Sequence, residues 1–391
     1  MKPIVRGLVY ILIVTIVFGG ISCEKDRQRG KYDKVVLLYL AANNNLSTHA
    51  LDNIVALKKG YLPSVNDKNI LLVYKHIKGQ KPELIRLFKD QNGVIVEDIV
   101  AAYEDHNSAS PEVLKGVLNK IKTIFPTDNY GLILWSHASG WLPSGYYGTT
   151  KAPGAPFEDP YASIVKSFAE DGGVEMEISA LKSAIPYELE FLILDCCFMG
   201  GIEVIYDLRK CANYIMASPT EILATGFPYE SVIRPLFKYR ADLQEVANIY
   251  YDFYSPKNSS PPTIYNSATI ALYDTKEIED IATVCNDIFV QNREKIALVN
   301  RNSVQPYFRF GQDYFFDLDD YISRIATASQ LNGFRKELSE AVVIKLATEN
   351  FLDIPIKKFS GLSIYIPQIP NGELENYYKT IEWNQRTKLV N

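Results

Sequence analysis

Short apolar runs alternate with amphipathic helical segments between residues 34 and 218, and this alternation restricts the fold more than any other feature of the chain. Near-continuous apolar strands without polar alternation are typical of parallel strands that are covered on both faces. Together with the helical segments between them, they predict an α/β fold with a mostly parallel central sheet. The runs are "KVVLLYLAA" (34–42), "NILLVYKH" (69–76), "YGLILW" (130–135), "FLILD" (191–195) and "YIMAS" (214–218).

Local signals place several helices and one hairpin between these strands. A helix is predicted from Ser47, and another from Pro111, because Ser110 is a good N-cap and proline suits the first helical position. Segments 82–90 and 93–101 predict a hairpin, with "QNG" at its turn.

From about Pro228 the sequence is richer in helical patterns. We therefore expect residues 34–230 to form the core, and residues 231–391 to form a helical elaboration that completes the same domain. The predicted helices cover 241–254, 275–299 and 334–350, and two strand candidates cover 268–274 and 361–367.

The first 33 residues are expected to lie outside the fold. Basic side chains precede an apolar stretch, Leu8–Phe18, that is short for a membrane span, and "GGISC" then places small residues before Cys23. This resembles a bacterial lipoprotein signal. It predicts a signal peptide over 1–22, a lipid on Cys23 and a polar tether over 23–33, with membrane attachment through the lipid. A plain secretory signal cut nearby, or an uncleaved anchor, are the alternatives.

Charge and cysteine usage exclude some classes of protein. The formal net charge is −5 and no long basic stripe is present, which argues against a nucleic-acid partner. Without Cys23, four cysteines remain, and their spacing fits neither a disulfide scaffold nor a structural zinc site. Cys196 and Cys197 are adjacent, and adjacent cysteines rarely bridge each other because of the strain in the peptide between them.

Two predicted strand ends carry residues with catalytic chemistry. "YGLILW" leads into His137, and "FLILD" leads into the two adjacent cysteines. In open α/β sheets ligands bind beyond the carboxyl ends of the strands, so a histidine and a thiol at neighbouring strand ends form a candidate acid/base and nucleophile. A core thiol and a structural histidine explain the same residues equally well.

Strand alternation distinguishes the two cysteines. If the extended conformation continues past Leu194, Asp195 and Cys197 share one face, and Cys196 points the other way. Cys197 also precedes a predicted helix, whose N-terminal dipole favours a thiolate. We therefore expect Cys197 to be reactive and Cys196 to be a small buried apolar residue.

The sequence resembles the clostripain-like cysteine peptidases, relatives of gingipains, legumain and caspases. The resemblance covers most of the mature chain and implies a caspase-like α/β/α sandwich. It rests on blocks in the family's order: "VVLLYLAANNNLS", "LILWSHASGW", the Asp-x-Cys-x-Met block in "LILDCCFMGGIEV", "MASPTEILATGFPY", "FDLDDY" and "GLSIYIP".

The resemblance implies an endopeptidase that acts on peptide or protein substrates by thiol acylation. Cys197 would attack the scissile carbonyl and His137 would protonate the leaving amine. The backbone amides of Cys197 and Ala138 would form the oxyanion hole. Asp195 matches a position that lines the P1 pocket and favours Arg or Lys, and Glu221 is a candidate second acidic wall.

The histidine block departs from the family's usual Trp-Asp-His-Gly-Gly-Gly-Trp, because it reads "WSHASGW". Ala138 adds a Cβ near the substrate, and Ser136 removes a charge. A second hypothesis is therefore a catalytically weak or inactive lipoprotein of the same fold that serves as a binding or scaffold module. No cofactor is required by the sequence; calcium is implied by the resemblance alone, since no contiguous carboxylate loop is present.

The segment after His137 predicts a maturation cleavage. Residues 142–166 are long and rich in glycine and proline, and long loops inside compact domains are usually functional. Related enzymes are often cut between the histidine and the nucleophile, which makes Lys151–Ala152 the expected bond; an uncut substrate-binding loop is the alternative. N-terminal sequencing of the active protein should show a second chain that begins at Ala152. A single intact chain with full activity would contradict the prediction.

Overall fold

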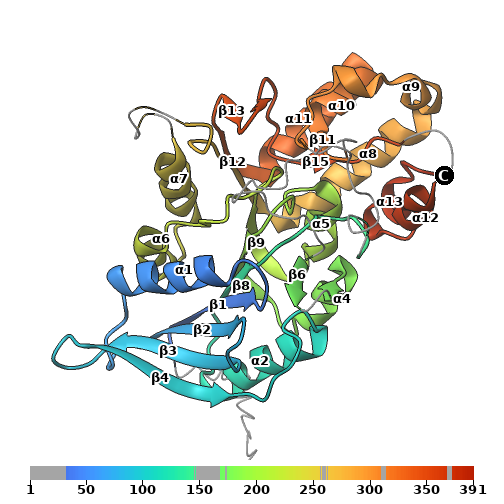
Figure 1. The fold of residues 1–391 in the computed structure, drawn as a ribbon. Helices are drawn as coiled ribbons and strands as arrows, with labels where there is room; N and C mark the ends of the chain where they lie inside the picture. Colours follow the sequence, from blue (N-terminus) through green and yellow to red (C-terminus); the bar gives the residue numbers. More distant parts are fainter. Residues whose placement is uncertain are drawn as a thin grey trace, which may run out of the picture.

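A nine-stranded sheet forms the centre of the protein (Figure 1). The computed structural model describes residues 32–144, 146, 168–171, 174–255, 257, 261, 263–309, 314–367 and 372–391. Across the sheet the strands are β12 (Val342–Ala347), β10 (Thr269–Asp274), β9 (Ala212–Ala217), β8 (Leu189–Asp195), β5 (Tyr130–Trp135), β1 (Lys34–Ala42), β2 (Asn69–Ile77), β3 (Glu83–Lys89) and β4 (Ile95–Ala102).

The sheet is parallel in its middle and antiparallel at both ends. Neighbouring strands from β9 to β2 pair in parallel, whereas β10, β12, β3 and β4 pair antiparallel to their neighbours. The predicted mostly parallel sheet is confirmed. The chain passes from β1 to β2 on one side and returns to β5 on the other, so the strand order reverses between β1 and β5. Such a reversal is where open α/β sheets bind their ligands.

Helices cover both faces of the sheet, which gives the α/β/α layers (Figure 1). Alternate side chains of β1 supply the two apolar cores: Val36 and Leu38 belong to one, Val35 and Leu37 to the other. One face carries α1 (Ser47–Lys59), α6 (Tyr229–Leu236) and α7 (Leu243–Tyr254); the other carries α2 (Pro111–Ile124), α4 (Ile178–Ala184), α5 (Ile202–Leu208) and α8 (Ile278–Gln291).

The N-terminal half follows the sequence predictions closely. The α2 helix begins at Pro111, and the Ser110 side chain accepts a hydrogen bond from the Val113 N–H. The predicted hairpin is β3 and β4, which pair antiparallel.

The C-terminal part contains more sheet than was predicted. The helix expected over 334–350 is α11 (Ala328–Ala341), which ends where the β-branched Val342, Val343 and Ile344 begin edge strand β12. The helix expected over 275–299 is divided into η2 (Thr275–Glu277), α8 and α9 (Arg293–Leu298). Residues after 230 therefore contribute β10 and β12 to the central sheet.

The smaller elements surround this core. The strand candidate at 361–367 is only β15 (Ser363–Ile364), which pairs with β11 (Phe316–Asp317) outside the main sheet. The others are β6 (Phe168–Asp171), β7 (Val174–Met176), η3 (Arg301–Ser303), α10 (Leu318–Ile325), β13 (Asn350–Phe351), β14 (Ile354–Pro355), α12 (Glu373–Tyr378) and α13 (Glu382–Thr387).

Several predictions fall outside this description. The signal peptide, the lipid on Cys23 and the Lys151–Ala152 bond all involve residues that the structure does not describe. Within the described ranges, no helix has both the length and the apolar character that crossing a membrane requires.

Two glycine-to-alanine variants should change stability in opposite directions. A Cβ on Gly131, in β5, would lie 2.0 Å from the ring of buried Phe191 on β8, so Gly131→Ala should lower the free energy of unfolding by roughly 1–3 kcal/mol. Gly116 is exposed inside α2 with open space around it, so Gly116→Ala should raise that free energy by roughly 0.5–1 kcal/mol. Urea denaturation measures both, and a stabilised Gly131→Ala variant would show that the two strands separate easily.

Candidate active site

Parallel pairing brings His137 and Cys197 to one edge of the sheet. Trp135 at the end of β5 pairs with Asp195 at the end of β8. His137 and Cys197 each lie two residues beyond this pair. The two predicted catalytic residues therefore follow neighbouring strand ends, as the sequence suggested.

The turn that contains Cys197 has an unusual backbone. The β8 strand ends at Asp195, residues 197–200 form a turn, and Phe198 has a φ of 59°. A left-handed conformation at a non-glycine residue costs about 1–2 kcal/mol, so packing must maintain it. The Phe198 ring is fully buried and stacks on Phe315 with ring centroids 4.6 Å apart.

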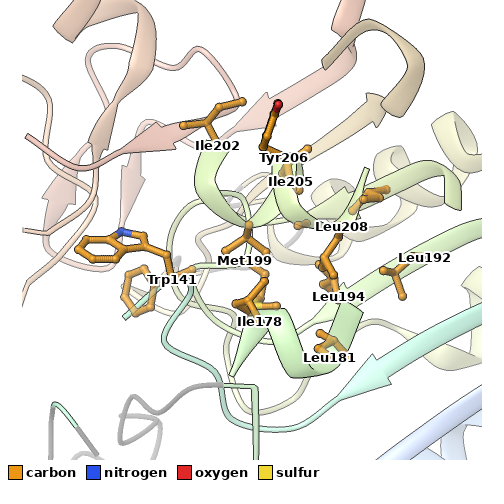
Figure 2. Packing of buried hydrophobic residues seen from close by; sticks show 14 of the residues in the cluster. Trp141, Ile178, Leu181, Leu192, Leu194, Met199, Ile202, Ile205, Tyr206 and Leu208 are labelled. Atoms are coloured by element: carbon orange, nitrogen blue, oxygen red, sulfur yellow. The ribbon is translucent and has the colours of Figure 1, made fainter. Parts of the chain in front are cut away.

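Met199 holds the same turn through apolar contacts. Figure 2 shows its side chain gathered with Ile178 and Leu194 in the apolar cluster between β8 and the neighbouring helices. The stacking of Phe198 and the apolar contacts of Met199 thus hold the two residues that follow Cys197, and they restrict the Cys197 backbone.

The histidine loop touches the cysteine turn directly. Gly140 has a φ of 62°, and a Cβ there would lie 2.6 Å from the Phe198 carbonyl oxygen. Only glycine combines this conformation with so close an approach. Gly140 therefore sets the distance between the loop that carries His137 and the turn that carries Cys197.

The Cys197 thiol is buried under the loop that follows β9. Its side chain is 2% exposed, the Ile222 N–H donates to Sγ over 3.3 Å, and the Ile222 carbonyl oxygen lies 3.6 Å from the same sulfur. An N–H donor favours a thiolate. The α5 helix begins at Ile202 with Gly201 as its N-cap, shortly after Cys197, as the sequence predicted.

Cys196 has the environment of a packing residue. Its sulfur lies 3.9 Å from the Leu134 carbonyl oxygen, and burial raises the pKa of its thiol well above the usual range. The prediction that Cys196 and Cys197 point to opposite faces of the sheet needs correction. Since β8 ends at Asp195, extended alternation stops there, and Cys196 and Cys197 both join the core that contains Leu194.

His137 is buried and bonded to the loop that follows β1. Its Nε2 lies 2.7 Å from Oδ1 of Asn45, and its backbone carbonyl accepts from the Ala169 N–H over 3.0 Å. Its neighbour Ala138, predicted to supply an oxyanion-hole amide, is also fully buried. Ser136 stands where the usual block has aspartate, and its hydroxyl donates a hydrogen bond to the Ala41 carbonyl over 2.7 Å.

Asp195 is buried beside the thiol with one oxygen bonded. Its Oδ2 accepts from the Tyr229 hydroxyl at 2.7 Å and from the Phe227 N–H at 3.1 Å. Its Oδ1 is buried and has no hydrogen-bond partner among the described residues. Burial raises the pKa of this carboxyl to about 7, although the two hydrogen bonds oppose the shift.

A cavity of about 10 Å³ lies beside Asp195 under the covering loop, a volume that holds at most one water molecule. Asp195, Cys196 and Cys197 line it together with Ile222 and Gly226 of the loop. Gly226 has a φ of 68°, and a Cβ there would lie 2.8 Å from Asp195 Oδ2, so the loop is fitted closely to the carboxyl. An amino-acid side chain enters this space only when the loop moves.

Glu221 lies at the start of the same loop but does not line that cavity. Its carboxylate is 2% exposed and pairs with the Arg309 guanidinium, with Nε to Oε2 at 2.7 Å and Nη2 to Oε1 at 3.3 Å. The structure thus separates Glu221 from Asp195, and an internal arginine already binds it.

Within the described ranges, no group of three or more His, Cys, Asp and Glu side chains is arranged to hold a metal ion. Calcium is also bound by backbone carbonyl and amide oxygens, so the calcium that the resemblance implied stays a prediction.

Comparison with known proteins shows the family of this chain. The Clostripain family profile matches residues 38–387. Clostripain from Hathewaya histolytica is 22% identical over 433 aligned positions, which cover 90% of this chain and 81% of that protein. An inactive zymogen C11 protease from Parabacteroides distasonis is 31% identical with a TM-score of 0.78, covering 91% of this chain and 98% of that chain.

A secreted C11 cysteine protease from Bacteroides thetaiotaomicron, solved with an irreversible peptide inhibitor, is 28% identical with a TM-score of 0.77. The match covers 92% of this chain and 100% of that chain. The layered fold, with a thiol and a histidine at adjacent strand ends, defines a cysteine peptidase of the caspase-like α/β/α type. The chain belongs to the Clostripain family.

Sequence reasoning missed four contributors to this site: Asn45, Phe198, Ile222 and Arg309. Asn45 was visible as the last asparagine of "NNN" after a predicted strand, but its partner depended on strand order. The left-handed Phe198 has no local signal, because a phenylalanine does not favour that conformation. Ile222 and Arg309 reach the site from distant segments.

Mutation of the two adjacent cysteines should have clearly different effects. Cys197→Ala should abolish peptide hydrolysis, since its sulfur is the one that an amide N–H contacts beside Asp195. Cys196→Ala should retain hydrolysis and lose about 1 kcal/mol of stability, as for an ordinary buried residue. Steady-state kinetics and thermal denaturation of both variants test this. Activity in Cys197→Ala and none in a folded Cys196→Ala would reverse the assignment.

Proposed function

We propose that this protein is an endopeptidase that cleaves after arginine in preference to lysine, with Cys197 as nucleophile and His137 as general acid and base. The observation that carries the specificity is Asp195, a buried carboxyl beside the thiol whose Oδ1 has no partner among the described residues. A buried acceptor without a partner costs about 1–3 kcal/mol. A cationic substrate side chain would remove that cost.

The chemistry follows from the two side chains. The Cys197 thiol gives its proton to the imidazole, and the thiolate attacks the scissile carbonyl carbon, whose π electrons move to oxygen. The tetrahedral intermediate collapses as the imidazolium protonates the leaving amine, which leaves a thioester. Water then loses a proton to the imidazole and attacks the thioester, and the thiol leaves with that proton.

The oxyanion is assigned to the backbone amides of Cys197 and Ala138. The structure narrows the choice of donors, because the next amide along the turn, Phe198 N–H, already donates to the Thr220 carbonyl at 2.8 Å. The Gly200 N–H likewise donates to the Ser218 carbonyl at 2.8 Å. Loss of one such donor typically costs roughly 10²–10³ in rate.

Arginine fits Asp195 better than lysine. A guanidinium presents several N–H donors in a planar fork, whereas an ammonium is a point charge that is more strongly hydrated. Glu221 contributes less than the sequence suggested, since its carboxylate is bound by Arg309. We therefore assign the P1 charge to Asp195.

The described conformation corresponds to a latent enzyme. Ile222 covers the sulfur and the cavity beside Asp195 holds at most one water molecule, so substrate needs the loop from Glu221 to Tyr229 to withdraw. Cleavage after Lys151 is the event we propose for that release. A related chain of 31% identity is itself described as an inactive zymogen.

We also propose attachment to the cell envelope through a lipid on Cys23. The support is the sequence pattern before that cysteine. A relative of 28% identity is described as secreted, which places that enzyme, like a lipoprotein, beyond the cytoplasm.

The P1 preference is tested with fluorogenic peptides that differ only at P1. Wild type should cleave after Arg more efficiently than after Lys, and poorly after neutral residues. Asp195→Asn should lower kcat/KM for Arg by about 30-fold or more, since losing one partner of a buried charge pair costs roughly 2–5 kcal/mol. Cleavage after neutral residues should change little. Asp207→Asn is the control, because Asp207 is also buried with a pKa of about 7 but lies on α5.

The same set tests the charge of Asp195 by its pH dependence. Burial raises the pKa of this carboxyl to about 7 in the described conformation, and protonation removes its charge. The ratio of Arg to neutral cleavage should therefore fall as the pH decreases through the pKa of Asp195 and level off above it. The ratio cancels the titration of the catalytic pair. Asp195→Asn should flatten the ratio and Asp207→Asn should not. Strong cleavage after acidic or aliphatic residues by wild type would refute the assignment, and an inert thiol in an activated chain would favour a binding role.

A further inference from the structure

We propose that Asn45 positions His137 for catalysis, by accepting a hydrogen bond that fixes which ring nitrogen carries the proton. The inference rests on the proposed role of His137 and extends the catalytic pair by one residue. Its basis is the 2.7 Å distance between Asn45 Oδ1 and His137 Nε2.

The fold places these two residues together at the reversal of strand order. Asn45 follows β1 and His137 follows β5, and the strand order of the sheet reverses between those two strands. The last paired position is Leu40 with Trp135, so both loops leave the sheet side by side. A side chain from one loop reaches the other without any long-range adjustment.

The Asn45 loop is rigid enough to orient a ring. The Asn44 side chain closes a local turn through the Leu46 N–H at 2.8 Å, and the Asn43 side chain donates to Asp171 at 2.7 Å. Ser47 donates to the Ala42 carbonyl at 2.6 Å. Each asparagine of the "NNN" motif thus has a different partner, and Asn45 is the one that reaches the histidine.

The His137 backbone is held by a hydrogen bond of its own. The carbonyl of His137 accepts from the N–H of Ala169, a buried residue with a φ of 58°. This bond fixes the main chain but does not select a tautomer of the imidazole. The bond to Asn45 does so, because an amide oxygen only accepts.

The chemical consequence is a defined proton path. With Nε2–H donated to Asn45, the neutral ring presents an unprotonated Nδ1 that can take the thiol proton. After that transfer Nδ1–H is the donor that protonates the leaving amine, while Nε2–H stays on Asn45. Without Asn45 the ring loses the acceptor that favours the Nε2–H tautomer, so fewer enzyme molecules hold an unprotonated Nδ1.

The experiment compares Asn45→Ala and Asn45→Asp in the full mature chain, with the preferred fluorogenic peptide. Asn45→Ala should lower kcat by roughly 10- to 100-fold with little change in KM, as expected when a histidine loses its orienting partner. Asn45→Asp keeps an acceptor in place and should recover most of kcat. Its carboxylate beside Nε2 favours the imidazolium, so the alkaline limb of the kcat profile should move to higher pH.

The titratable groups on neighbouring elements are unchanged in both variants: Asp195 at the end of β8, Cys197 after it, and Asp171 in β6. A shift in the alkaline limb of the kcat profile therefore reports the carboxylate that Asn45→Asp introduces. Thr48→Ala is the matched control, since Thr48 is exposed near the start of α1, three residues after Asn45, and should leave the profile unchanged.

Two results would overturn the proposal. One is Asn45→Ala with the kcat and pH profile of wild type; the other is equal loss in Asn45→Ala and Asn45→Asp with no movement of the alkaline limb. Failure of the proposed function looks different, because His137→Ala would then hydrolyse peptide as well as wild type does. A dead His137→Ala beside a fully active Asn45→Ala refutes the positioning role alone.

Discussion

The parallel pairing of β1, β5 and β8 is the constraint on which the rest of the site depends. Because the three strands are neighbours in one sheet and point the same way, their carboxyl ends deliver three loops to one edge. Those loops carry Asn45, His137 and Cys197. A shift of register by one residue in any of these strands would turn the loop residues away from one another.

Backbone geometry then sets how closely the loops after these strands approach each other. Gly140 and Phe198 both have positive φ, and they meet where a Cβ on Gly140 would contact the Phe198 carbonyl oxygen. The cost of the left-handed Phe198 is offset by its stacking on Phe315, which comes from a segment more than a hundred residues later. The late part of the chain therefore contributes to the site by holding the turn that carries Cys197.

Buried carboxylates hold the covering loop in the described conformation. Asp195 holds the covering loop through Tyr229 and Phe227, and Glu221 holds its beginning through Arg309. Asp195 Oδ1 is not used in that contact. The same carboxyl thus fastens the loop in the described conformation and, under the proposed function, would receive a substrate cation once the loop has withdrawn.

The sequence by itself determined the layered α/β class, the central strands, and the histidine and thiol at two strand ends. These follow from local apolar patterns and from residue types that stand beside them. It misassigned β12 as the end of a helix, because edge strands are half exposed and their pattern is weak. Only the tertiary structure decided that Asn45 meets His137, that Ile222 covers Cys197 and that Arg309 binds Glu221. Each of these contacts joins segments distant in the chain, and such contacts depend on strand order and loop packing, which no local pattern encodes.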